Sequence, residues 1–187
     1  MLVSSVIILT KTTFGLLFYL KSITGSMDIN TLKIIEMTPE YASLVSTWKY
    51  EGIYSFYDGN ADNVADYMDG THYVCINATG DIIGYYCFGQ EARIPTVEKY
   101  TYNDDFLDIG LGLKPDLCGA GFGLSFFNKG IEFARKAYNI NNFRLSVAVF
   151  NERAIKVYQK AGFTIKCEVT NAVYNNRFYI MEGVYAL

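Results

Sequence analysis

Three glycines at alternate positions mark the first place in this chain where chemistry is expected. The segment Cys118-Gly119-Ala120-Gly121-Phe122-Gly123 lies between a strand-like run, 108–113, and a helical stretch, 124–138. Glycines leave backbone amide groups bare, and here those groups would converge on the positive end of a helix dipole. The pattern predicts a backbone-lined anion site. It lacks the Gly-Lys-Ser/Thr ending of a nucleotide-binding P-loop and the glycine spacing of a dinucleotide fold.

A second group of residues follows the next strand-like run, 144–149. It consists of Asn151, Ala154, Tyr158 and the pair Gly162-Phe163. Asn151 and Tyr158 are seven residues apart, so a helix would place both on one face. Asn151 suits the N-cap of that helix, and Gly162 suits its end.

Together the two segments resemble the signatures of the GNAT acetyltransferase superfamily, whose members move an acetyl group from acetyl-CoA to an amine. The first signature reads Gln/Arg-x-x-Gly-x-Gly/Ala, and residues 118–123 fill it with Cys118 in place of Gln or Arg. The second reads Asn-x-x-Ala-x-x-x-Tyr-x-x-x-Gly-Phe, which 151–163 match at every position. The resemblance covers roughly residues 28–187 and extends to the branch that includes ribosomal-protein N-terminal acetyltransferases.

The resemblance implies an α/β fold with a mixed, mostly antiparallel twisted sheet. About seven strands are expected, with flanking helices and two central strands that splay apart. The domain is expected to span 27–187. Residues 1–26 read as an extension outside it, because Met27 directly precedes the first residues that read as the domain. The alternative is a membrane anchor, but Lys11 interrupts the apolar runs and none reaches the ~20 residues of a membrane span.

The resemblance also implies acetyl-CoA as cosubstrate. Residues Cys118, Gly119, Ala120, Gly121, Phe122 and Gly123 would hold its pyrophosphate, and Asn151 would reach the cofactor as well as cap its helix. Backbone groups of Leu111 and Leu113 would pair with the pantetheine arm in the gap between the splayed strands. The plainer alternatives are a glycine-rich turn, a helix cap and ordinary strand core.

Two residues are the catalytic candidates. By resemblance Tyr158 points its hydroxyl at the CoA sulfur, where a phenol can protonate the departing thiolate. Asp108 lies near the place where several relatives hold a catalytic Glu and would accept the amine proton through a water. The alternatives are a packed aromatic and a solvated strand-edge carboxylate. No cysteine lies where an acyl-enzyme is expected, so the amine would attack directly in a ternary complex.

The aromatic segment 49–59 is the candidate wall of the acceptor cleft. Glu51, Trp48 and Tyr54 are the predicted substrate-binding residues, although core packing explains the aromatic rings equally well. The acceptor is either a small amine or a peptide N-terminus. The rival hypothesis is a GNAT-fold module that binds CoA without turnover, as a sensor or scaffold.

Composition narrows the remaining choices. The 187 residues suit one domain, and the 51% hydrophobic and 19% charged content argues against disorder. The net charge of −3 and the absence of a Lys/Arg run argue against nucleic-acid binding. The four cysteines and the sole histidine show no metal-ligand spacing, so no metal is expected. Reduced thiols indicate a cytoplasmic protein. The protein is expected to be a monomer or a homodimer.

The elements that must position these residues follow from hydrophobic periodicity and turn signals. Strands are expected at 32–37, 72–77, 82–88, 106–113, 142–149, 164–170 and 177–184. Helices are expected at 39–48, 64–68, 124–138 and 152–161, with loops at 49–59 and 90–105. In the long helix, Phe127, Ile131 and Ala134 should form the core face.

Overall fold

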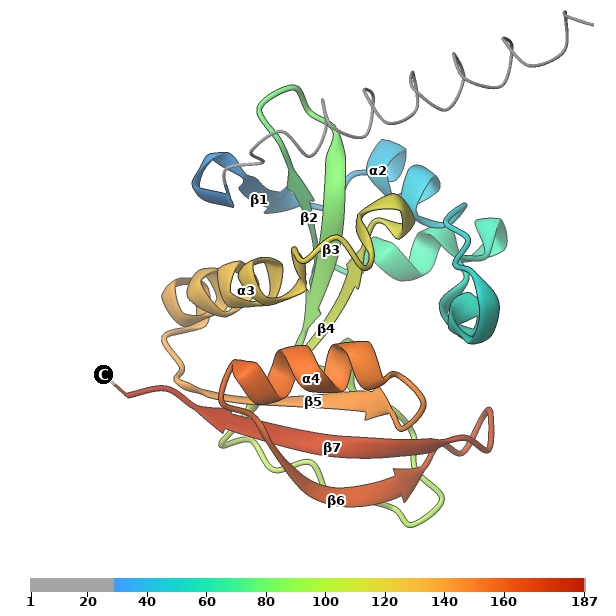
Figure 1. The fold of residues 1–187 in the computed structure, drawn as a ribbon, viewed down its shortest axis with the longest axis vertical. Helices are drawn as coiled ribbons and strands as arrows, with labels where there is room; N and C mark the ends of the chain where they lie inside the picture. The colour runs from blue at the N-terminus through green and yellow to red at the C-terminus, as the bar shows by residue number, and fades with distance from the viewer. Residues whose placement is uncertain (1–28, 187) are drawn as a thin grey trace, which may run out of the picture. The chain divides into compact units, whose positions relative to one another are not determined.

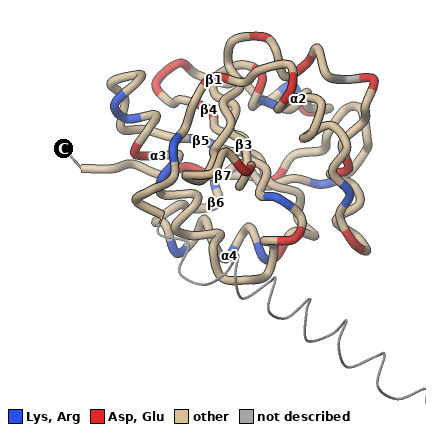
Figure 2. The backbone as a smooth tube through the Cα atoms, turned by 90° about the horizontal axis from the view of Figure 1, so that it is seen from above, with Lys and Arg blue, Asp and Glu red and all other residues tan. Residues whose placement is uncertain are grey.

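The computed structural model describes residues 29–186 (Figure 1). The extension predicted for residues 1–26 lies outside the described residues. From Leu32 onward the chain forms a single compact unit. None of the helices within 29–186 has the length and hydrophobicity that crossing a bilayer requires. Acidic and basic residues are interspersed along the described fold (Figure 2).

A seven-stranded sheet forms the centre of the unit, with the strand order β1-β2-β3-β4-β5-β7-β6. Each neighbouring pair is antiparallel except β4 and β5, which run parallel. This confirms the predicted mixed sheet. The strands are β1 (Lys33–Glu36), β2 (His72–Ile76), β3 (Ile82–Phe88), β4 (Leu107–Leu113), β5 (Asn142–Ala148), β6 (Thr164–Thr170) and β7 (Arg177–Val184).

The one parallel contact is short. β4 and β5 pair only at Leu107 with Phe143 and at Asp108 with Arg144. β4 stays paired with β3 as far as Leu113, while β5 pairs with β7 along its whole length. The sheet therefore opens between β4 and β5 beyond Asp108, as Figure 1 shows, and the predicted splay is confirmed.

Within residues 29–186, three α-helices accompany the sheet: α2 (Pro39–Val45), α3 (Gly123–Tyr138) and α4 (Glu152–Lys160). Short 3-10 helices fill several connections: η2 (Gly52–Tyr57), η3 (Ala61–Tyr67), η4 (Gly89–Ala92) and η5 (Pro115–Leu117). The predicted helix 39–48 ends earlier, at Val45. The reason is that the amides of Thr47 and Trp48 bond three residues back rather than four, which tightens the last turn. The predicted loop 49–59 contains η2.

Helix α3 packs closely on β3 through its apolar face. Phe127, Ile131 and Ala134 are buried as predicted. The Tyr86 ring lies so close to the helix that a Cβ on Gly130 would be 2.4 Å from it. The Tyr86 hydroxyl donates to the Phe126 carbonyl at 2.7 Å. This contact fixes where α3 begins, and so where the glycine segment lies.

Candidate active site

The glycine segment joins β4 to α3 through η5. Gly119 and Gly121 have φ angles of +80° and +89°, in the left-handed region that glycine adopts without a steric penalty. Helix α3 begins at Gly123, and no described side chain caps its N-terminus. A Cβ on Gly121 would meet no atom within 4 Å. The segment thus presents an open helix N-terminus, which favours an anion.

Helix α4 begins beside the same segment. A Cβ on Gly123 would lie 3.0 Å from Val157 of α4. Asn151 caps α4, because its Oδ1 accepts from the Ala154 amide at 3.2 Å, which confirms the predicted cap. Its Nδ2 donates to the Tyr57 hydroxyl at 3.4 Å and so ties α4 to η2.

Tyr158 is buried on the inner face of α4, with 9% of its surface exposed. Its ring lies 4.9 Å from the ring of Phe127, centroid to centroid. Burial, and next the nearby Tyr57, raise the pKa of the Tyr158 phenol. The phenol therefore stays protonated at neutral pH, the state that a proton donor requires.

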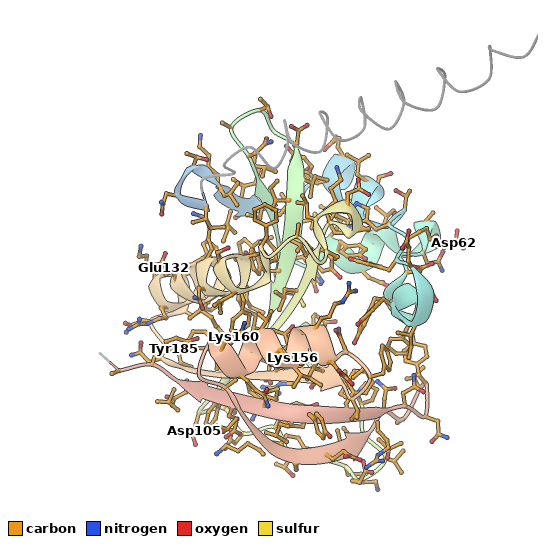
Figure 3. The ribbon with its side chains drawn as sticks, viewed as in Figure 1. Asp62, Asp105, Glu132, Lys156, Lys160 and Tyr185 are labelled. Carbon is orange, nitrogen blue, oxygen red and sulfur yellow. The ribbon has the colours of Figure 1, made fainter. Side chains whose placement is uncertain are left out.

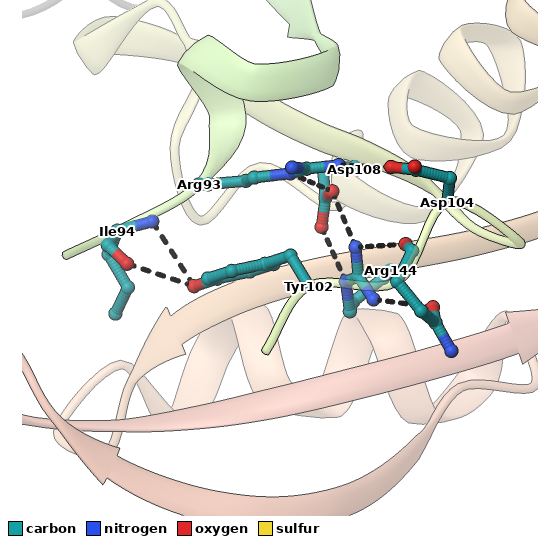
Figure 4. A network of polar contacts seen from close by, with 7 residues as sticks. Arg93, Ile94, Tyr102, Asp104, Asp108 and Arg144 are labelled. Atoms are coloured by element: carbon teal, nitrogen blue, oxygen red, sulfur yellow. Dashed lines mark hydrogen bonds and ion pairs between the residues drawn. The ribbon is translucent and has the colours of Figure 1, made fainter. Parts of the chain in front are cut away.

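Asp108 lies in a buried ion-pair network (Figure 4). The side chain is 2% exposed. Its Oδ1 accepts from Arg144 Nε at 2.7 Å, and its Oδ2 accepts from Arg144 Nη2 and Arg93 Nε, each at 2.7 Å. A carboxylate held by two guanidinium groups and removed from solvent is poorly placed to accept a proton. The structure therefore opposes the predicted general-base role and the alternative of a solvated carboxylate.

The network continues into the connection before β4. Arg144 is fully buried and donates to the side chain and the carbonyl of Asn103. Its guanidinium carbon lies 4.8 Å from the centre of the Tyr102 ring. Sequence reasoning missed this cluster. The available signal was an arginine inside the mainly apolar strand segment 143–148, which required a buried partner.

The predicted substrate-binding residues separate in the structure. Glu51 and Tyr54 line a pocket of about 540 Å³ together with Cys118 and Arg153, so they lie beside the glycine segment. Trp48 packs instead against the core cluster that includes Val45 and Val74, with its ring centroid 6.0 Å from that of Tyr85. Core packing accounts for Trp48.

The predicted pantetheine-binding residues lie on the part of β4 that β5 has left. Leu111 and Leu113 are both half-buried there. The Leu113 carbonyl accepts from the Tyr50 hydroxyl at 3.1 Å. Among residues 29–186, no group of three or more His, Cys, Asp or Glu side chains is placed to hold a metal ion.

Comparison with known proteins agrees with this geometry. The model of the acetyltransferase (GNAT) family matches residues 37–163, more than half of the chain. The splayed sheet, the glycine segment and the family match define the class: the chain belongs to the GNAT family and is an acetyl-CoA-dependent N-acetyltransferase. No curated protein sequence matches the chain.

Solved structures share the fold at low sequence identity. A chimera of the spermidine N-acetyltransferase SpeG from Vibrio cholerae and hSSAT is 16% identical, with a TM-score of 0.63, and covers 82% of this chain and 95% of its own. The Vibrio cholerae enzyme in complex with CoA and spermine is 14% identical, with a TM-score of 0.57, and covers 83% and 96%. A dodecameric form in an intermediate state is 14% identical, with a TM-score of 0.59, and covers 83% and 94%.

Proposed function

We propose that this N-acetyltransferase acetylates a small primary amine by direct attack on bound acetyl-CoA in a ternary complex. The observation that carries the proposal is the opening between β4 and β5, with the glycine segment on the open end of α3 at its edge. An extended arm can enter such an opening while its phosphates rest at the helix N-terminus. The spermidine N-acetyltransferase complex with CoA and spermine supports a small amine as acceptor.

The cofactor is assigned to the β4–α3 side. Amide groups of residues 119–123 bind the pyrophosphate, and backbone groups of Leu111 pair with the pantetheine arm. The Leu113 carbonyl already accepts the Tyr50 hydroxyl, so Leu113 pairs with the pantetheine arm through its remaining backbone groups. Asn151 holds the mouth of the site by fixing both α4 and η2.

In the transfer step, the amine nitrogen attacks the thioester carbonyl and the carbon–sulfur bond breaks. Tyr158 donates its proton to the departing thiolate. Asp108 is left out of the reaction because its two oxygens are already bound by arginines. The amine therefore enters as the free base. The proton that its nitrogen sheds after the attack passes to solvent, and solvent returns a proton to the Tyr158 phenolate.

The smaller acceptor is favoured over a peptide N-terminus by the packing around η2. The Phe56 ring lies 5.5 Å from the ring of Phe150 and 5.2 Å from the ring of Tyr174, centroid to centroid. Phe150 belongs to the β5–α4 connection and Tyr174 to the β6–β7 connection, so these edge-to-face contacts join η2 to both. We infer that η2, held in this cluster, leaves room for a small acceptor and not for an extended peptide.

Thiol release from acetyl-CoA tests the proposal against a panel of spermidine, spermine, aromatic alkylamines and short peptides. At least one small amine should give release, and initial-rate plots in both substrates should intersect. Parallel plots would indicate an acyl-enzyme instead of direct attack. Release with peptides alone would move the acceptor to the peptide class.

A second candidate is a CoA-binding module without turnover, and the sequestered Asp108 is the observation that favours it. Tight acetyl-CoA binding with no release above the hydrolysis background across the panel would select this candidate. We also propose a cytoplasmic location, which the four free thiols support, and a monomeric or homodimeric state.

A further inference from the structure

A cation from α4 lies beside the glycine segment. Nη1 of Arg153 is 3.9 Å from the position that a Cβ on Gly119 would occupy. Its guanidinium carbon lies 3.7 Å from the centre of the Tyr54 ring. Arg153, Tyr54 and Cys118 all line the 540 Å³ pocket. Burial raises the pKa of the Cys118 thiol, and the nearby charge of Arg153 opposes that rise.

Arg153 has no anionic partner within the described residues. Arg93 and Arg144 both pair with Asp108, and Arg177 pairs with Glu168. No carboxylate of residues 29–186 comes within 4.0 Å of Arg153, although Glu51 and Asp116 line the same pocket.

The ring of Tyr54 covers only one face of the Arg153 guanidinium. A guanidinium stacked on an aromatic ring keeps the N–H groups along its edge available for hydrogen bonds. Lys49, the other cation in the pocket, is already bound to the Gly59 carbonyl at 2.9 Å and paired with Asp58 at 3.6 Å. Arg153 is therefore the cation that remains open to an anion at this end of the site.

We propose that Arg153 binds the pyrophosphate of CoA from α4, in place of the polar side chain that Cys118 has removed from the glycine segment. The inference rests on the proposed CoA site. Cysteine is a weak hydrogen-bond donor, and Cys118 directs its sulfur at the carbonyls of Leu113 and Lys114. A planar guanidinium, in contrast, matches two phosphate oxygens at once.

The stack on Tyr54 gives this contact a second consequence. Tyr54 belongs to η2, the segment proposed to border the acceptor. A cofactor phosphate that fixes Arg153 also fixes the ring stacked on it. Tyr54 is thus a positioning residue that couples cofactor binding to the placement of η2.

Calorimetric titration with CoA and with dephospho-CoA tests the assignment. R153Q should weaken both ligands by about tenfold, the worth of one charge-assisted hydrogen-bonded contact at an exposed site, and R153K should recover part of the loss. K156Q is the matched control. Lys156 lies on the same helix, pairs with Glu152 at 3.6 Å and is exposed (Figure 3), so K156Q should bind as the parent does.

The possible outcomes distinguish a failure of this inference from a failure of the proposed function. A parent protein that fails to bind CoA overturns the proposed function and the inference together. Parent-like CoA binding by R153Q overturns the inference alone. A loss confined to CoA, with dephospho-CoA unaffected, also overturns it, because Arg153 would then contact the 3′-phosphate.

A double-mutant cycle tests the role of Tyr54. Y54F retains the ring and should bind CoA as the parent does, while Y54L should weaken CoA severalfold. The loss in the Y54L/R153Q double variant should fall well short of the sum of the two single losses, because each single change disrupts the same contact. Additive losses would show that Tyr54 acts independently of Arg153.

Discussion

At Asn151 one side chain serves two elements. Its oxygen caps α4 and its nitrogen donates to Tyr57, so the helix that carries Tyr158 and the segment η2 are fixed together. Tyr57 in turn contributes to the raised pKa of Tyr158. The position of Asn151 thus bears on both the helix that carries Tyr158 and the residue next to the Tyr158 phenol.

Replacing Tyr158 by Phe should isolate the proton-donating hydroxyl. The ring and its contact with Phe127 remain, so acetyl-CoA affinity should be unchanged. The turnover rate should fall by about 10²- to 10⁴-fold, the usual contribution of a general acid. Stopped-flow measurement of the acetyl-transfer step, with acetyl-CoA affinity measured in parallel, checks both parts. A transfer step at the parental rate would reduce Tyr158 to a packed aromatic.

The pH dependence should report on the acceptor rather than on an enzyme carboxylate. Because Asp108 is bound by Arg93 and Arg144, kcat/KM should rise with pH in proportion to the deprotonated fraction of the amine. Two acceptors with different amine pKa values should give profiles displaced by that difference. Profiles of kcat/KM that reach their plateau at the same acidic pH for both amines would instead indicate a carboxylate base in the site.

Whether a feature of a single residue could be predicted depends on how far apart in the sequence its contacting residues lie. The glycine segment and the Asn151 cap were predictable, because left-handed glycines and N-caps depend on neighbours within a few residues. The fate of Asp108 was not. Its partners lie 15 and 36 residues away, and only the assembled sheet brings them together.

At the scale of elements, the approach of α3 to β3 determines where the cofactor loop lies. Gly130 has no side chain at the point where Tyr86 meets the helix, and the Tyr86 hydroxyl bonds the helix backbone. The strands and the two long helices were predictable from periodicity and caps. The early end of α2 and the helical turn η2 were not, because turns with three-residue hydrogen-bond spacing are too short to show a periodic apolar pattern in the sequence.

Gly130→Ala should destabilise the protein despite the higher helix propensity of alanine. Propensity favours alanine by about 1 kcal/mol, but a Cβ 2.4 Å from the Tyr86 ring forces the two elements apart. Overpacking of this kind costs about 1–3 kcal/mol, so the net change should be a loss. Urea unfolding measures it. The exposed Asn128→Ala on the same helix should show no loss, and a Gly130→Ala variant as stable as the parent would refute the close contact.

Asp108→Asn should act on stability, as a break in the seam between β4 and β5. The change leaves Arg93 and Arg144 without their shared charge in a buried position, which costs about 3–5 kcal/mol. Thermal and urea unfolding check this loss. Asp104, which lies 3.7 Å from Arg93 and is fully exposed, supplies the control, since Asp104→Asn should leave the unfolding midpoint unchanged. An equally small effect at Asp108 would contradict the structural role.

At the scale of the whole unit, two parts of one sheet meet along a short line. Strands β1–β4 and strands β5–β7 share two paired positions, reinforced by the Asp108 network. The two parts of the sheet are thereby joined at one end of β4 and separated at the other. The family signatures implied this opening. The ion pairs at the end of β4 that remains paired with β5 could not be predicted from any local sequence pattern.

The central claim is that acetyl-CoA binds in this opening with its phosphates on the glycine segment. Gly121→Glu adds bulk and negative charge there, and Gly80→Glu is the matched control, because Gly80 has the same φ of +89° in the β2–β3 turn. Calorimetric titration should show parent-like acetyl-CoA binding for Gly80→Glu and at least about tenfold weaker binding for Gly121→Glu. Equal acetyl-CoA affinity in the folded Gly121→Glu variant and the parent would contradict the claim.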